Sequence, residues 1–236
     1  MRPWLTRWVQ GAGYFWLSTA FLVGEHEFLL PRLQIIVADK PARYKGDYIM
    51  KPLAKYHFFT QLRTEIQQHI ISVKHLFQPL TLDHRAWRPT QRVWSIEQCF
   101  EHLNLTHDYY RPKIDQALAH AEHLLPASDT YTPSFWARIY MYFAFNPRYS
   151  FPTAAALTPP VVVNEAVLTQ YLVRQTALFD ILDQATPIDL CTTPVRIKPG
   201  IRFNLGDCLK ILVYHDALHI GQARGILTQL QSAGNA

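Results

Sequence analysis

The chain has 236 residues, a length typical of one domain or of one domain with an appendage. Hydrophobic residues make up 49% and charged residues 17%, which excludes a chain that is disordered by composition. The net charge of +5 is scattered without a basic run, so we expect no nucleic-acid partner. The cysteines Cys99, Cys191 and Cys208 are odd in number and form no C-x-x-C motif, which favours a reducing, cytoplasmic location.

Residues 1–49 differ in pattern from the rest of the chain. The stretch from Val9 to Gly24 is uncharged and aromatic, like part of a signal peptide, but no small-residue cleavage site follows it. It is also shorter than the roughly 20 residues of a membrane span, so membrane association is not expected. We interpret residues 1–49 as an extension that either precedes a true start at Met50 or is poorly ordered; a membrane or export anchor is the alternative. Residues 50–236 then form the domain.

Two amphipathic helices are predicted in the first half of this domain. Apolar residues recur at steps of three and four from Tyr56 to Phe77, the period of one helical face. The second helix begins at Ser95, which forms a capping box with Gln98, and continues to about residue 118. Pro112 lies inside this second run, where it kinks a helix more readily than it ends one.

An aromatic and proline-rich connection follows over residues 126–162, with a short helix expected at 134–144. This connection can pack against the bundle, cover a site as a lid, contact a second subunit or face a membrane. A third helix begins near Asn164, a favourable N-cap. Prolines and a glycine then indicate a long loop over residues 187–200.

A last helix begins at Asn204, with Asp207 three residues further on, and ends near Gly234. No segment shows sustained alternation of apolar and polar residues. The pattern therefore predicts an all-α fold, a four-helix bundle with a long aromatic and proline-rich connection between its second and third helices.

Two histidines on the last predicted helix indicate a metal site. His215 and His219 are four residues apart, so they lie on one face of a helix, in an apolar setting where unpaired imidazoles are costly. Asp216 follows the first histidine where zinc peptidases carry a glutamate, which argues against that class. Three protein ligands leave a metal with an open position, and His102, close to the apolar face of the second helix, is the best third ligand.

The other histidines are expected elsewhere. His107 lies five residues after His102 and points in a different direction. A further group has polar neighbours in the sequence and is predicted on the surface: His69, His75, His84, His120 and His123.

Several other polar or sulfur-containing residues lie near the predicted ligands. Gln222 shares a helix face with His215 and either hydrogen-bonds a ligand or bound water or is an ordinary helix-face amide. Asp216 and Glu101 each adjoin a ligand in sequence and so point away from the metal, which leaves no obvious general base. Cys99 and Cys208 either face the metal or, the simpler interpretation, are small core residues.

Two stretches resemble motifs of the DinB-like (DinB/YfiT) four-helix bundles. Trp94 to Leu103 (WSIEQCFEHL) resembles the W-S-x6-H-L opening of their second helix, and His215 to Gln222 (HDALHIGQ) resembles H-D-x-x-H-x-G-Q on the fourth. The resemblance covers roughly residues 53–232, whereas residues 1–49 have no counterpart.

The resemblance implies one divalent metal, usually nickel or zinc, held by His102, His215 and His219, and a homodimer. It also implies a small-molecule substrate, because characterised relatives include transferases and isomerases that use a low-molecular-weight thiol. We therefore expect a metal-dependent thiol S-transferase or a hydrolase that acts on small electrophiles. The alternatives are a non-catalytic, stress-associated metal-binding bundle and a helical module tethered to a membrane by residues 1–24.

Overall fold

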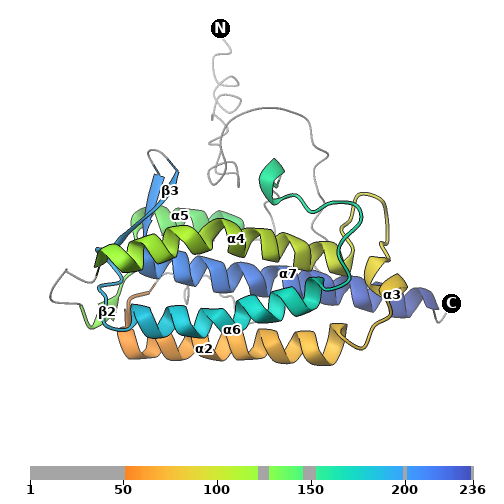
Figure 1. The fold of residues 1–236 in the computed structure, drawn as a ribbon, viewed down its shortest axis with the longest axis horizontal. Helices are drawn as coiled ribbons and strands as arrows, with labels where there is room; N and C mark the ends of the chain where they lie inside the picture. Colours follow the sequence, from red (N-terminus) through yellow and green to blue (C-terminus); the bar gives the residue numbers. More distant parts are fainter. Residues whose placement is uncertain (1–50, 122–127, 146–152, 199–200, 235–236) are drawn as a thin grey trace, which may run out of the picture.

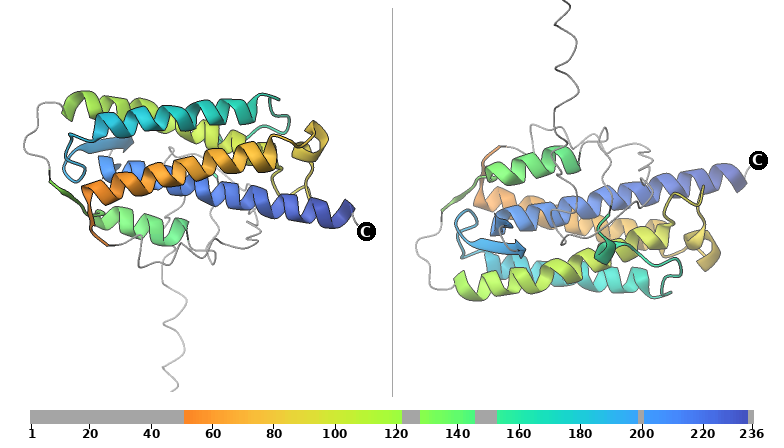
Figure 2. Two further views of the ribbon diagram at one scale, coloured as in Figure 1. Left: turned by 90° about the horizontal axis from the view of Figure 1, so that it is seen from below. Right: turned by 90° about the horizontal axis from the view of Figure 1, so that it is seen from above.

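The computed structural model describes residues 51–121, 128–145, 153–198 and 201–234. Four long helices lie side by side (Figures 1 and 2): α2 (Lys55–Ser72), α4 (Ile96–Ala121), α6 (Val167–Ala185) and α7 (Leu205–Gly234). Both α2 and α4 pack against α6 and α7, so α2 and α4 occupy opposite corners of the bundle. The predicted four-helix bundle is confirmed, while the predictions for residues 1–49, Met50 and His123 lie outside the described residues.

The two helices that carry the predicted ligands begin at reciprocal caps. The Ser95 backbone N–H donates to Gln98 Oε1 at 3.0 Å, and the Gln98 N–H donates to Ser95 Oγ at 3.2 Å. At the start of α7, the Asp207 N–H donates to Asn204 Oδ1 at 2.6 Å, and the Asn204 N–H donates to Asp207 Oδ2 at 3.4 Å. Because each cap satisfies backbone donors that a helix end leaves unpaired, the sequence sets where α4 and α7 begin.

The connection between α4 and α6 contains three short elements: β2 (Thr130–Tyr131), α5 (Phe135–Ala144) and a 3₁₀ turn, η3 (Ala155–Leu157). The predicted short helix is α5, and it begins where the Ser134 hydroxyl accepts from the Ala137 N–H at 3.2 Å. α5 packs against α7, and η3 packs against α4. In Figure 2, α5 lies along the outside of the bundle. Part of the aromatic connection thus packs on the bundle.

The remaining elements extend or close the ends of the bundle. A π-helical turn, η2 (Val73–Phe77), continues α2, so the first predicted helix extends to Phe77 as expected. A short helix, α3 (Leu82–Ala86), precedes α4, and β1 (Leu53–Ala54) pairs antiparallel with β2. Pro112 lies within α4 without ending it.

Two predictions about boundaries and loops were wrong. Residues 187–200 were expected to form a loop without strands, yet β3 (Pro194–Lys198) pairs antiparallel with β4 (Ile201–Asn204). The side chains of Val195 and Ile197 point inward and are buried against the core. The alternation of apolar and polar residues that they create is bounded by prolines and is too short to predict a strand from the sequence. Helix α6 begins at Val167, because the Asn164 side chain accepts from the Ala166 N–H at 2.8 Å and holds a turn before the helix.

The apolar core consists of two clusters at opposite ends of the bundle. One cluster includes Phe58, Ile114 and Leu209, and the other includes Phe77 and Phe100. Each of the four long helices carries buried polar residues between its contributions to the two clusters: His69 on α2, His107 on α4, Gln175 on α6, and Asp216 and His219 on α7. His102 lies at the edge of this layer, next to Leu103 of the second cluster, and reaches His215 of α7. The bundle therefore has a polar middle layer, and the predicted metal ligands lie in it.

Candidate metal centre

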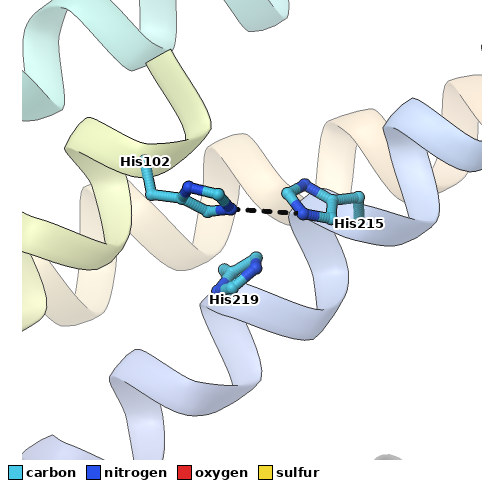
Figure 3. Close-up of side chains that lie close together, drawn as sticks. All are labelled: His102, His215 and His219. Atoms are coloured by element: carbon cyan, nitrogen blue, oxygen red, sulfur yellow. Dashed lines mark hydrogen bonds between the residues drawn. The ribbon is translucent and has the colours of Figure 1, made fainter. Parts of the chain in front are cut away.

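The three predicted ligands meet in this middle layer. His102 lies in the second turn of α4, and His215 and His219 lie one turn apart on α7, with their rings facing one another (Figure 3). The Nε2 atoms of His102 and His215 are 3.3 Å apart, and one nitrogen from each of the three rings lies within 4.8 Å of the others. His102 and His219 are buried, whereas His215 is partly exposed.

Two carbonyl oxygens determine which ring nitrogens are free to bind a metal. His102 Nδ1 lies 2.7 Å from the backbone oxygen of Leu157 in η3, and His219 Nδ1 lies 2.9 Å from Gln222 Oε1. Since a carbonyl oxygen only accepts, each Nδ1 carries the proton and donates it, which leaves the Nε2 lone pair unprotonated. Metal-binding histidines are commonly oriented through their second nitrogen in this way.

The three rings are neutral at pH 7. Burial lowers the pKa of His102 to about 4, and the carbonyl of Leu157 opposes this only in part. Burial, reinforced by the neighbouring histidines, lowers the pKa of His215 and of His219 well below the usual value. A ring nitrogen binds metal only when it is unprotonated, so the site is prepared for a cation without releasing protons.

The geometry and the donor set fit a divalent transition metal. Two nitrogens at 2.0–2.1 Å from a tetrahedral ion are about 3.3 Å apart, which matches the separation of His102 and His215. Imidazole nitrogens suit zinc, nickel and copper. No cysteine or carboxylate joins the histidine group within the described part of the chain, so a bound cation would keep its full charge and an open position.

The indole of Trp94 covers one side of this group. Its ring centroid lies 4.9 Å from that of His102 and 5.9 Å from that of His219. Trp94 itself is 7% exposed, and it immediately precedes the cap of α4. The tryptophan of the W-S motif thus shields two of the ligands from water, which strengthens electrostatic interactions at the site.

A second polar cluster lies beside the ligands in the same layer. His107 Nε2 contacts both carboxylate oxygens of Asp216, at 2.9 and 3.1 Å, and the Gln175 amide donates to Asp216 Oδ2 at 2.6 Å. Asp216 therefore points away from the three histidines, and His107 points elsewhere, both as expected. Glu101 is only partly buried and does not belong to the histidine group.

The remaining predictions for site residues have mixed outcomes. Gln222 lies at the site, where it contacts His219. His75, His84 and His120 are exposed as expected, but the prediction for His69 was wrong, because this side chain is only 4% exposed and lies in the middle layer. Cys99 and Cys208 lie in the two apolar clusters, and burial raises the pKa of both thiols, so they behave as core residues.

Two features of the site were not found from the sequence. The carbonyl of Leu157 comes from a turn 55 positions away from His102, and a backbone acceptor has no sequence signal. His69 did have a signal, because it lies three residues after Ile66 and four before Val73, on the buried face of α2.

The family model of the DinB superfamily matches residues 65–223, two thirds of the chain. The chain belongs to the DinB superfamily. The match includes both motif stretches and all three histidines, so the resemblance seen in the sequence is confirmed. No curated protein and no solved structure matches the chain significantly. None of the described helices combines the length and the apolar composition needed to cross a lipid bilayer.

Proposed function

We propose that this DinB superfamily protein binds one divalent cation, nickel or zinc, through His102, His215 and His219. The observation that carries the proposal is the convergence of three neutral imidazoles from two helices. Leu157 and Gln222 hold two of these rings through their Nδ1 atoms, and Trp94 covers them.

We further propose a metal-dependent reaction on a small electrophilic substrate, either transfer of a low-molecular-weight thiol or hydrolysis. A divalent cation with an open position lowers the pKa of a thiol or a water bound to it. The protein contributes ligands without charge, a fixed ring orientation and a covering indole. These features preserve the cation's charge and exclude competing water from its covered side.

A non-catalytic metal-binding bundle is the second candidate, and two observations favour it. Within the described residues, no carboxylate is placed beside the histidines to act as a base, since Asp216 is held by His107 and Gln175. In the cavity beside His102 and His215, the centre of a water molecule can lie within a volume of only about 10 Å³. The cavity therefore holds about one water. A substrate would have to widen it.

Metal analysis of the purified full-length protein tests the centre. We expect about one divalent ion per chain, and more than about 100-fold weaker binding in His102→Ala, His215→Ala and His219→Ala, because each ligand supplies a sizeable share of the binding free energy. His120→Ala, an exposed histidine on α4, is the matched control and should bind like the wild type. Metal retained in all three ligand variants would refute the site.

A thiol and electrophile screen of the metal-loaded protein separates the two candidate functions. Turnover that is lost in His102→Ala supports an enzyme. Bound metal without turnover for any combination of thiol and electrophile supports the non-catalytic bundle.

We also propose a cytoplasmic homodimer. The outer face of α5 exposes Phe135 and Trp136 at 68% and 54%, a composition suited to a subunit contact. Sedimentation equilibrium should give twice the chain mass of 27.4 kDa, and the dimer should weaken in Trp136→Glu. A single species at the chain mass would contradict the dimer.

A further inference from the structure

A small cavity adjoins the metal centre on the side toward α5. Its wall includes His102, Thr106 and Tyr110 from α4, and His215 from α7. The three residues of α4 are spaced by four, so they form one stripe along the helix. Leu157 of η3, Tyr140 of α5, and Ile211 and Leu212 of α7 complete the wall.

The hydroxyl of Tyr110 is the unexplained group in this cavity. The side chain is 2% exposed, and its oxygen has no hydrogen-bond partner within the described residues. The neighbouring hydroxyl of Thr106 is not comparable, because it donates to the backbone oxygen of His102 at 2.8 Å. A buried hydroxyl without a partner is costly, so it calls for a ligand.

The direction and charge state of this hydroxyl suit a role at the metal centre. Tyr110 lines the same cavity as His102 and His215, and long side chains on a helix tend to lean toward its N-terminus, which is the direction of His102. Burial raises the pKa of Tyr110 well above its usual value, so the group remains a hydrogen-bond donor at neutral pH. The cavity that Tyr110 lines together with His102 and His215 admits about one water-sized group.

We propose that the Tyr110 hydroxyl donates a hydrogen bond to the acceptor oxygen or nitrogen of a small ligand, and that this one atom occupies the cavity beside His102 and His215. The proposal rests on the metal centre of the proposed function and adds a residue that contacts the ligand. It assigns the ligand's class: a small anion or the acceptor atom of a substrate.

Formate binding to the Co²⁺-loaded full-length protein tests this assignment, with Co²⁺ absorption as the readout. Tyr110→Phe should weaken formate binding about 10- to 100-fold, the usual loss for a hydrogen bond to a charged acceptor, while Co²⁺ binding stays within about twofold. Tyr109→Phe is the control, because the Tyr109 hydroxyl donates to the backbone oxygen of Ile197 at 3.1 Å and does not line the cavity. It should bind formate like the wild type.

Equal formate affinity in wild type and Tyr110→Phe, with Co²⁺ bound, would overturn the assignment of Tyr110 and leave the metal centre intact. A wild-type chain that binds no Co²⁺ would overturn the metal centre, and the assignment with it.

Stability of the metal-free protein gives a second test that does not depend on formate. Removing an unpaired buried hydroxyl should raise the Tm of Tyr110→Phe by about 2–4 °C. A lower Tm would show that the hydroxyl is already bonded inside the protein, which would overturn the proposal.

Discussion

Two polar clusters lie side by side on α4 and α7, and only the second contains a carboxylate. In the first, His102 faces His215 and His219, three neutral rings that each turn one nitrogen toward the others. In the second, one helical turn and a half along α4, His107 faces Asp216. The carboxylate is hydrogen-bonded to the His107 ring, whereas no charged group contacts the three rings of the first cluster. The same residue type therefore serves packing in the second cluster and is free to hold a metal in the first.

The comparison also shows how the second cluster supports the first. Asp216 follows His215 directly, and its carboxylate is fixed by His107 on α4 and Gln175 on α6. Successive residues of a helix point about 100° apart, so fixing the direction of Asp216 also fixes that of His215. The contact between Asp216 and His107 therefore orients α7 before any metal binds.

The largest expected effect comes from breaking the second cluster. His107→Leu leaves the fully buried Asp216 without its imidazole partner, so unfolding should be easier by about 3–5 kcal/mol in a urea titration. Asp108→Ala is the control, because Asp108 adjoins His107 in the sequence and forms an exposed ion pair with Arg174. It should lower the free energy of unfolding by less than about 1 kcal/mol.

The double variant His107→Leu with Asp216→Leu sharpens this test. It should recover much of the lost stability, because two apolar side chains can replace a buried polar pair and leave no carboxylate without a partner. A His107→Leu protein as stable as the wild type would show that the pair does not hold α7.

The second-largest expected effect is a loss of folding stability at acid pH, which arises from the histidines of the first cluster. The pKa of His102 is about 4 in the folded, metal-free protein and about 6.5 in the unfolded chain, so as pH falls below 6.5 the unfolded state takes up the proton first. The contribution of His102 to the free energy of unfolding is therefore constant above pH 6.5. Between pH 6.5 and 4 the free energy of unfolding falls by about 3 kcal/mol from this group alone, and below pH 4 it levels off. His215 and His219 add to the loss with the same sign.

Chemical denaturation across this pH range measures the effect. His102→Ala should flatten the pH dependence, and the exposed-residue control His120→Ala should keep it. A wild-type protein whose stability is constant from pH 6.5 to 4 would contradict the neutral, buried state of the ligands.

The smallest expected effect concerns the support behind the ligands. Gln222→Leu removes the acceptor of His219 Nδ1, so metal affinity should fall about tenfold without loss of the one-to-one stoichiometry. Gln231→Leu, an exposed glutamine on the same helix, is the control in a chelator competition assay. Unchanged affinity in Gln222→Leu would mean that the contact does not orient the ring.

The sequence predicts the long helices well because their signals are local. The capping boxes at Ser95 and Asn204 and the three-to-four spacing of apolar residues need no knowledge of tertiary contacts. The β3–β4 hairpin escaped prediction because its burial comes from packing against α4, which a three-residue alternation does not reveal.

The convergence of the three histidines was predictable from the sequence, but the residues that surround them were less so. His215 and His219 follow from helical spacing, and His102 from its place beside an apolar face. The Leu157 carbonyl and the cavity around Tyr110 arise where the long connection folds back over α4, and only the tertiary structure brings them together.

X-ray absorption spectroscopy of the zinc-loaded protein tests the central claim most directly. The account predicts three imidazole nitrogens at about 2.0–2.1 Å from the ion, and a signal that loses one imidazole in His102→Ala. A spectrum with sulfur at about 2.3 Å, or one that His102→Ala leaves unchanged, would contradict it.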